Sequence, residues 1–228
     1  NQSMKKWLCL VLTLLTLTVC VWAAAESTDW NYDLNYAILR GYNGAGGDVT
    51  VPAEIDGYTV DVIGVSVFGS EAITSLTLPE TVLELRSNAV SGCENMTSVT
   101  LPQSLVVINR MNFFSCNSLE EADIPAGVRY IGENSFRFCD ALRKITFEGV
   151  CPLIDKGCFS LIAEDAVAYV PDDELEAYTE AFERAGIEVP VQPSGKNAVV
   201  VENNGFAEED FEFDPATGTI TSYNGFAT

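Results

Sequence analysis

The sequence predicts a repeat solenoid, mainly β with short turns, that has a β cap at its N-terminal end and a helical cap at its C-terminal end. Three observations predict this fold class: apolar residues recur every 23 residues, short alternating segments contain them, and prolines follow at the same period. The apolar series are Leu78, Leu101, Ile124, Phe147 and Val170; Leu76, Val99, Ala122, Ile145 and Ala168; and Ile73, Met96, Leu119 and Leu142. Each unit has too few apolar groups to fold alone, so the units are expected to stack and share one core.

Residues 1–25 are predicted to form a signal peptide. Lys5 and Lys6 precede an apolar run that begins at Trp7, and the segment ends in three alanines before Glu26. The apolar segment is also nearly long enough to span a bilayer, so an uncleaved membrane anchor is the alternative. We expect cleavage before Glu26, no membrane insertion afterwards, and a protein that is secreted or held at the cell surface.

Residues 26–50 are predicted to form the N-terminal β cap. Apolar and aromatic residues at Trp30, Tyr32, 37–39 and Tyr42 indicate two strands on either side of a turn at 33–35. These two strands are expected to cover the first coil of the solenoid.

Residues 51–171 are predicted to form the repeats. The segment before each proline alternates between apolar and polar residues, as at 76–78 and 99–101, which indicates a short strand with one buried face. The prolines end these strands because proline cannot donate a hydrogen bond to the ladder. They are Pro79, Pro102, Pro125 and Pro171, and Glu148 takes the place of the proline in one repeat.

Two further apolar series follow each strand. Leu85, Ile108, Ile131 and Ile154 come six residues after the proline position, and Val90, Phe113, Phe136 and Phe159 are expected at a second inward turn. The first repeat is longer, because Pro52 and Pro79 are 27 residues apart, and it contains a turn signal at 56–58. We expect a wider loop there.

Residues 172–190 are predicted to form the C-terminal helical cap. Asp172 and Asp173 precede Leu175, Tyr178 and Phe182 at helical spacing, and Gly186 follows the last turn.

Residues 191–228 are predicted to be a linker followed by the start of a second repeat unit or by a terminal cap. Seven residues of the N-terminal cap reappear 181 positions later without a gap. Asp29, Trp30, Tyr32, Asp33, Tyr42, Asn43 and Gly44 correspond to Asp210, Phe211, Phe213, Asp214, Tyr223, Asn224 and Gly225. Two interpretations remain: a longer protein cut at Thr228, or strands that cap this end.

The cysteines are predicted to be mostly core residues. Cys93, Cys116 and Cys139 lie one repeat apart, which suits small buried hydrophobic groups better than pairwise disulfides. Cys151 and Cys158 fall outside this series and are close enough in sequence to pair with each other, but the sequence does not decide whether they do.

Composition narrows the classes of partner and reaction. The chain has 12 basic and 33 acidic residues, a formal charge of −21, and loss of Lys5 and Lys6 with the signal peptide leaves 10 against 33, or −23. Nucleic acid and anionic lipid are therefore not expected as partners. The chain has no histidine, and no carboxylate lies in a motif that would shift its pKa, so we expect no enzyme, no catalytic residue, no metal site and no cofactor.

The repeat at residues 124–142, IPAGVRYIGENSFRFCDAL, closely resembles the BspA-type, or Treponema-type, leucine-rich repeat. The resemblance covers about residues 51–171, with departures from the family pattern at Val90 and Glu148. It implies a leucine-rich repeat array that is exported or attached to the surface of a host-associated bacterium and takes part in adhesion. It implies no catalytic residues.

A candidate binding face follows from the alternation in the strands. Its outward residues are Ser75, Thr77, Ser98, Thr100, Glu121, Asp123, Lys144, Thr146 and Tyr169. Stacked repeats are expected to place them in adjacent rows, with Glu121 and Asp123 at the centre of a mostly polar ladder. The ladder is either an ordinary solvated sheet face or a recognition surface.

The first functional hypothesis is an exported, monomeric, non-catalytic module that binds a host or bacterial surface protein or glycan. The alternative is a structural spacer that presents a further domain beyond Thr228, which the repeated cap sequence favours. The sequence names neither the ligand nor the means of surface attachment.

Overall fold

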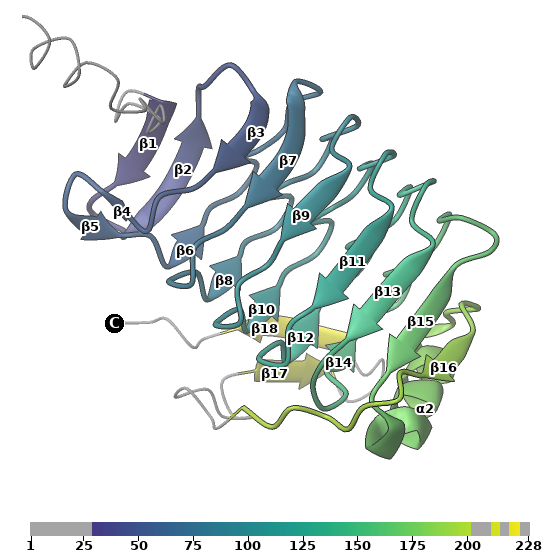
Figure 1. The fold of residues 1–228 in the computed structure, drawn as a ribbon. Helices are drawn as coiled ribbons and strands as arrows, with labels where there is room; N and C mark the ends of the chain where they lie inside the picture. Colours follow the sequence, from purple (N-terminus) through teal and green to yellow (C-terminus); the bar gives the residue numbers. More distant parts are fainter. Residues whose placement is uncertain (1–28, 202–210, 215–218, 224–228) are drawn as a thin grey trace, which may run out of the picture.

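The computed structural model describes residues 29–201, 211–214 and 219–223, and the signal peptide predicted at 1–25 lies outside them. The chain is a β-solenoid in which each repeat contributes one strand to a front sheet and a shorter strand to a rear sheet (Figure 1). The predicted fold class is therefore confirmed. No helix among the described residues has the length and apolar character needed to cross a membrane.

The front sheet is made of parallel strands that occur one per repeat. The strands β3 (Gly47–Thr50), β7 (Ile73–Thr77) and β9 (Ser98–Thr100) form one hydrogen-bonded group. The strands β11 (Glu121–Ile124), β13 (Lys144–Phe147), β15 (Val167–Val170) and β16 (Val191–Pro193) form a second. Pairs such as Leu76 with Val99 and Ile145 with Ala168 show that the register follows the 23-residue sequence period.

The rear sheet arises from the apolar position six residues after each proline. The strands β6 (Val62–Ile63), β8 (Glu84–Leu85), β10 (Val107–Ile108), β12 (Tyr130–Ile131) and β14 (Leu153–Ile154) pair in parallel. Each has only two residues, which is too short for alternation to reveal a strand in the sequence. The sequence therefore predicted the buried positions here, and the structure adds the strands.

The N-terminal cap is an antiparallel hairpin of β1 (Trp30–Asp33) and β2 (Ile38–Tyr42), and β2 continues the rear sheet by pairing with β6. The buried Trp30 ring lies 4.8 Å from the Tyr42 ring and 6.3 Å from the Phe68 ring. This aromatic cluster covers the first coil, as the sequence predicted.

The longer first repeat contains a second hairpin, of β4 (Glu54–Ile55) and β5 (Tyr58–Thr59). Its two turn residues, Asp56 and Gly57, have φ angles of 52° and 83°. Positive φ at both central residues is the geometry of a tight type I′ turn, which Asp-Gly favours. The extra residues thus form an ordered hairpin at the turn signal.

The core lies between the two sheets and repeats its packing from coil to coil. The ring of Phe136 stacks between those of Phe113 and Phe159, at 4.9 and 5.2 Å. Cys93, Cys116 and Cys139 are fully buried, and each thiol donates to a backbone carbonyl of the preceding repeat. Burial raises the pKa of these thiols, which fits their predicted role as core residues.

Cys151 and Cys158 are both free in the structure, so the disulfide that the sequence left open between them is not formed. Cys158 is fully buried, and its thiol donates to the carbonyl of Asp155 at 2.8 Å. Burial raises the pKa of the Cys151 thiol to about 12. Neither group has the lowered pKa of a reactive thiol.

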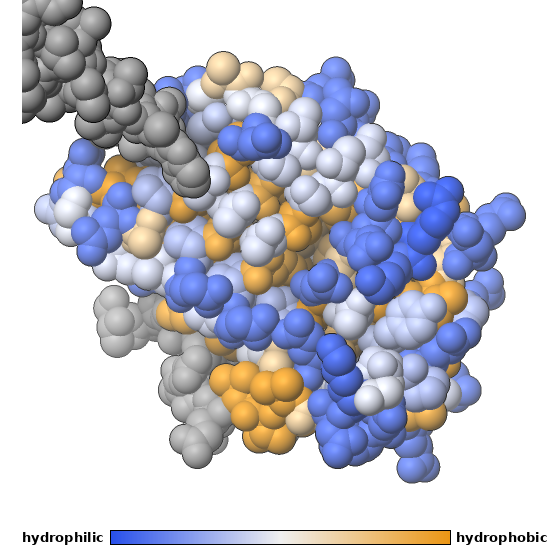
Figure 2. Space-filling model, viewed as in Figure 1, coloured by the Kyte–Doolittle hydropathy of each residue, from blue (hydrophilic) through white to orange (hydrophobic). Residues whose placement is uncertain are grey.

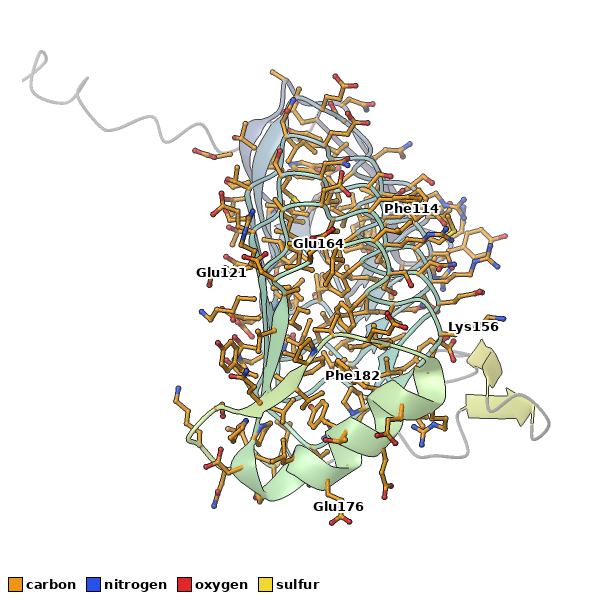
Figure 3. All side chains as sticks on the ribbon, turned by 90° about the vertical axis from the view of Figure 1, so that its right-hand side faces the viewer. Phe114, Glu121, Lys156, Glu164, Glu176 and Phe182 are labelled. Carbon is orange, nitrogen blue, oxygen red and sulfur yellow. The ribbon has the colours of Figure 1, made fainter. Side chains whose placement is uncertain are left out.

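The C-terminal cap is the 3₁₀ turn η2 (Asp172–Glu174) followed by the helix α2 (Leu175–Ala185), and Gly186 ends the helix with a φ of 65°. The helix lies across the open end of the stack, and Phe182 points into the core (Figure 3). The ring of Tyr178 lies 4.8 Å from Phe147, and its hydroxyl donates to the carbonyl of Gly149 at 3.1 Å. The helix therefore buries the last coil, as predicted.

A final hairpin pairs β17 (Phe211–Asp214) with β18 (Thr219–Tyr223). Its register reproduces that of β1 and β2 at every pair, including a shift at the second residue of the first strand, offset by 181 residues. The echo in the sequence is therefore also an echo in backbone pairing.

Candidate ligand-binding face

The structure places all nine candidate residues on the outer side of the front sheet, exposed or half-buried. Ser75 and Thr77 lie on β7, Ser98 and Thr100 on β9, Glu121 and Asp123 on β11, Lys144 and Thr146 on β13, and Tyr169 on β15. Figure 3 shows Glu121 pointing away from the core, on the side of the molecule opposite Lys156. Strand register sets neighbours side by side, for example Glu121 with Lys144 and Thr146 with Tyr169.

The face is divided into two halves, which the sequence did not predict. Strands β9 and β11 are adjacent, yet they belong to separate hydrogen-bonded groups. In Figure 2, pale and orange residues cover the face over β7 and β9, whereas blue residues gather over β11 and β13. We call these the hydroxyl half (β3, β7 and β9) and the charged half (β11, β13, β15 and β16).

The hydroxyl half contains one acidic residue that the sequence analysis missed. Asp48 on β3 accepts hydrogen bonds from the hydroxyls of Ser75 at 2.7 Å and Thr74 at 3.1 Å. These two hydrogen bonds lower the pKa of the Asp48 carboxyl. The strand β3 precedes the residues predicted as repeats, so a count that begins at Val51 overlooks it.

The charged half is organised around an ion pair between neighbouring strands. The ammonium Nζ of Lys144 lies 2.8 Å from Oε2 of Glu121. That hydrogen bond, together with the charge of Asp123 nearby, raises the pKa of Lys144. Both side chains are largely exposed, so the pair fixes the local arrangement of charge more than it stabilises the fold.

A hollow of about 600 Å³ lies over the charged half. It contains four of the nine candidate residues: Asp123, Lys144, Thr146 and Tyr169. The other lining residues are Phe147, Glu148, Pro171, Ser194, Lys196, Asn197 and Val199. The hollow thus unites residues of three strands with a segment that the sequence described only as a linker.

One wall of the hollow is formed by residues 194–199, which we call the strap. The backbone N–H groups of Gly195 and Ala198 donate to the carboxylates of Asp172 and Asp173, at 2.8 and 2.7 Å. The N–H of Ser194 donates to Val170 and that of Val199 to the carbonyl of Glu148, both at 2.8 Å. The paired acids before the helix were the sequence signal for this contact, but they were read only as a helix start.

The groups in the hollow are suited to binding. They include carboxylates, ammonium groups, hydroxyls, an amide and an aromatic ring. Two carboxyl groups whose pKa burial raises, Glu84 and Asp155, lie on or beside the rear sheet and are held by Asn109 and Tyr130. Within the described ranges, no three His, Cys, Asp or Glu side chains are arranged to hold a metal ion.

A protein-family model described as "BspA type Leucine rich repeat region" matches residues 57–186 in six copies. A leucine-rich repeat protein from Bacteroides capillosus is 31% identical over 53% of this chain and 93% of its own, with a TM-score of 0.46. The T. pallidum leucine-rich repeat protein TpLRR is 18% identical over 78% of this chain and 99% of its own, with a TM-score of 0.46. The pneumococcal vaccine antigen PcpA is 16% identical over 75% of this chain and 46% of its own, with a TM-score of 0.52. Among curated proteins there is no significant match.

Proposed function

Because the chain belongs to the BspA-type leucine-rich repeat family, we propose that it is an exported, non-catalytic module that binds protein or glycan ligands at the bacterial cell surface. Leucine-rich repeat arrays generally act as interaction scaffolds, since stacked repeats present a long regular surface. The signal-peptide pattern supports export, and the acidic composition suits a well-solvated surface protein.

The observation that carries this proposal is the hollow over the charged half. Four outward residues selected only by their alternation in sequence line a concave site of about 600 Å³. A volume of this order lies within the range of ligand pockets, and the site presents several polar groups beside an aromatic ring. A plain solvated sheet face would have neither the concavity nor the strap that walls it.

The test is binding of the mature segment, residues 26–228, to an array of host matrix proteins, mucins and glycans at physiological salt. For any saturable ligand, the double variant Glu121→Lys, Asp123→Lys is compared with Ser98→Lys, Thr100→Lys, which adds two lysines at equivalent positions on β9. We expect the first variant to lose binding and the second to retain it. Equal binding by both folded variants would remove the charged half from the proposal.

The second candidate is a structural spacer that presents a further domain. The observation that favours it is the repeated cap hairpin, since β17 and β18 reproduce the register of β1 and β2. The open reading frame beyond Thr228 tests this: a further repeat array or an anchoring domain would support a spacer, and a stop codon would count against it.

A further inference from the structure

We propose that the hollow over the charged half is a binding site for a neutral carbohydrate. The inference rests on the proposed binding function and narrows its ligand from protein or glycan to one chemical class. It is carried by the composition of the hollow, by its charge balance and by the strap that holds its wall.

The hydrogen-bonding groups of the hollow match those of a sugar. A sugar hydroxyl both donates and accepts, so a site for it needs acceptors and donors together. Asp123 and Lys196 supply one of each, and within residues 29–201 neither side chain forms a hydrogen bond or ion pair. The hydroxyl of Thr146 is buried without a hydrogen-bond partner among the described residues, although such groups are normally paired.

The hollow also offers an apolar surface for the C–H face of a sugar ring. Tyr169 is half-buried in its lining, and its ring stacks on no other ring of the described residues. On the opposite wall, Val199 is 55% exposed. An aromatic ring with a polar tip gives both a flat apolar contact and a hydrogen bond to one ligand.

The charge balance favours a neutral sugar over a charged one. The lining carries two carboxylates, Asp123 and Glu148, and two ammonium groups, Lys144 and Lys196. The net charge of −21 on the whole chain repels sulfated or sialylated polysaccharides at long range. A peptide strand is less suited, because the hollow lies over a sheet face and β-strand addition needs an open sheet edge.

The strap keeps the site formed before a ligand arrives. Five backbone N–H groups join residues 194–199 to the C-terminal cap region: those of Ser194, Gly195, Ala198 and Val199, and that of Asp172, which donates to Lys196. A wall fixed in advance lowers the ordering cost of binding. A shallow site for a small ligand can therefore reach a measurable affinity.

The experiment is a panel of neutral, sialylated and sulfated oligosaccharides on the mature segment, with NMR titration of each hit. We expect saturable binding of at least one neutral oligosaccharide, with a dissociation constant of about 1 mM or lower. Tyr169→Ala is expected to weaken it at least about tenfold. Tyr36→Ala is the matched control, since it removes an exposed tyrosine from the N-terminal hairpin and should leave affinity unchanged.

Three results would overturn the inference: no neutral oligosaccharide bound at about 10 mM, binding only to sialylated or sulfated members, or equal loss of affinity in both tyrosine variants. The proposed function is scored separately. If a protein ligand binds the same face and is lost in Asp123→Lys while no sugar binds, the binding function stands and the carbohydrate inference fails. If neither class of ligand binds the folded segment, both fail.

Discussion

The two halves of the front sheet share one backbone architecture but differ in chemistry. In the hydroxyl half, Ser and Thr side chains line β7 and β9, and Asp48 is engaged by two of their hydroxyls. In the charged half, the same register positions hold an ion pair, free charged groups and a tyrosine, and the strap adds a wall. The difference shows that the repeat specifies the scaffold, while the outward residues and the C-terminal cap decide where a ligand can bind.

The largest expected difference between the halves lies in the core beneath them. Phe136, stacked between two phenylalanines under the charged half, occupies the repeat position that Val90 fills under the hydroxyl half. We expect Phe136→Ala to lower the free energy of unfolding by about 3–5 kcal/mol. Val90→Ala should cost about 2 kcal/mol, because fewer buried groups are removed. Urea unfolding of the two variants measures this, and equal losses would contradict an aromatic stack specific to one half.

The next effect concerns the strap, which distinguishes the two halves most directly. Replacing both Asp172 and Asp173 by Ala removes the acceptors of two backbone hydrogen bonds, at about 1 kcal/mol each for such exposed groups. Amide hydrogen exchange of residues 194–199 should accelerate, whereas exchange in β7 should not change. Glu176→Ala, an exposed acid of the same helix, is the control. Equal exchange in all three proteins would show that the strap is held by other contacts.

The smallest effects are two pKa shifts of opposite kind. The folded-state pKa of Asp48 is lowered by hydrogen bonds, so its contribution to stability is present above the unfolded pKa of about 3.8 and is lost as pH falls through the lower folded value. The folded-state pKa of Lys144 is raised, so its contribution is present below the unfolded pKa of about 10.5 and is lost as pH rises through the higher value. NMR titration of each side chain measures both shifts.

Two substitutions separate these pKa shifts. Ser75→Ala should return the Asp48 pKa toward its ordinary value and leave Lys144 unchanged. Glu121→Gln should lower the Lys144 pKa and leave Asp48 unchanged. A shift that appears in both halves on either substitution would mean that the halves are electrostatically coupled across β9 and β11.

Much of the fold could be predicted because its signals are local and periodic. The spacing of the apolar residues determined the front strands, the buried thiols and the stacked phenylalanines, and the acids and Gly186 bounded the C-terminal helix. The two-residue rear strands could not be predicted, since they form only when several coils stack and pair them. Alternation likewise selected the nine outward residues, because side chains on a strand point to opposite faces in turn.

The hollow was a decision of the tertiary structure. Its strap is separated from β11 by about seventy residues of chain, and only the stacking of the coils and the helical cap brings Lys196 beside Asp123 and Tyr169. By itself the sequence determined the period, the buried faces and the family to which the chain belongs. A concave site needs walls from distant segments held by specific hydrogen bonds, and such contacts leave no periodic trace in a single sequence.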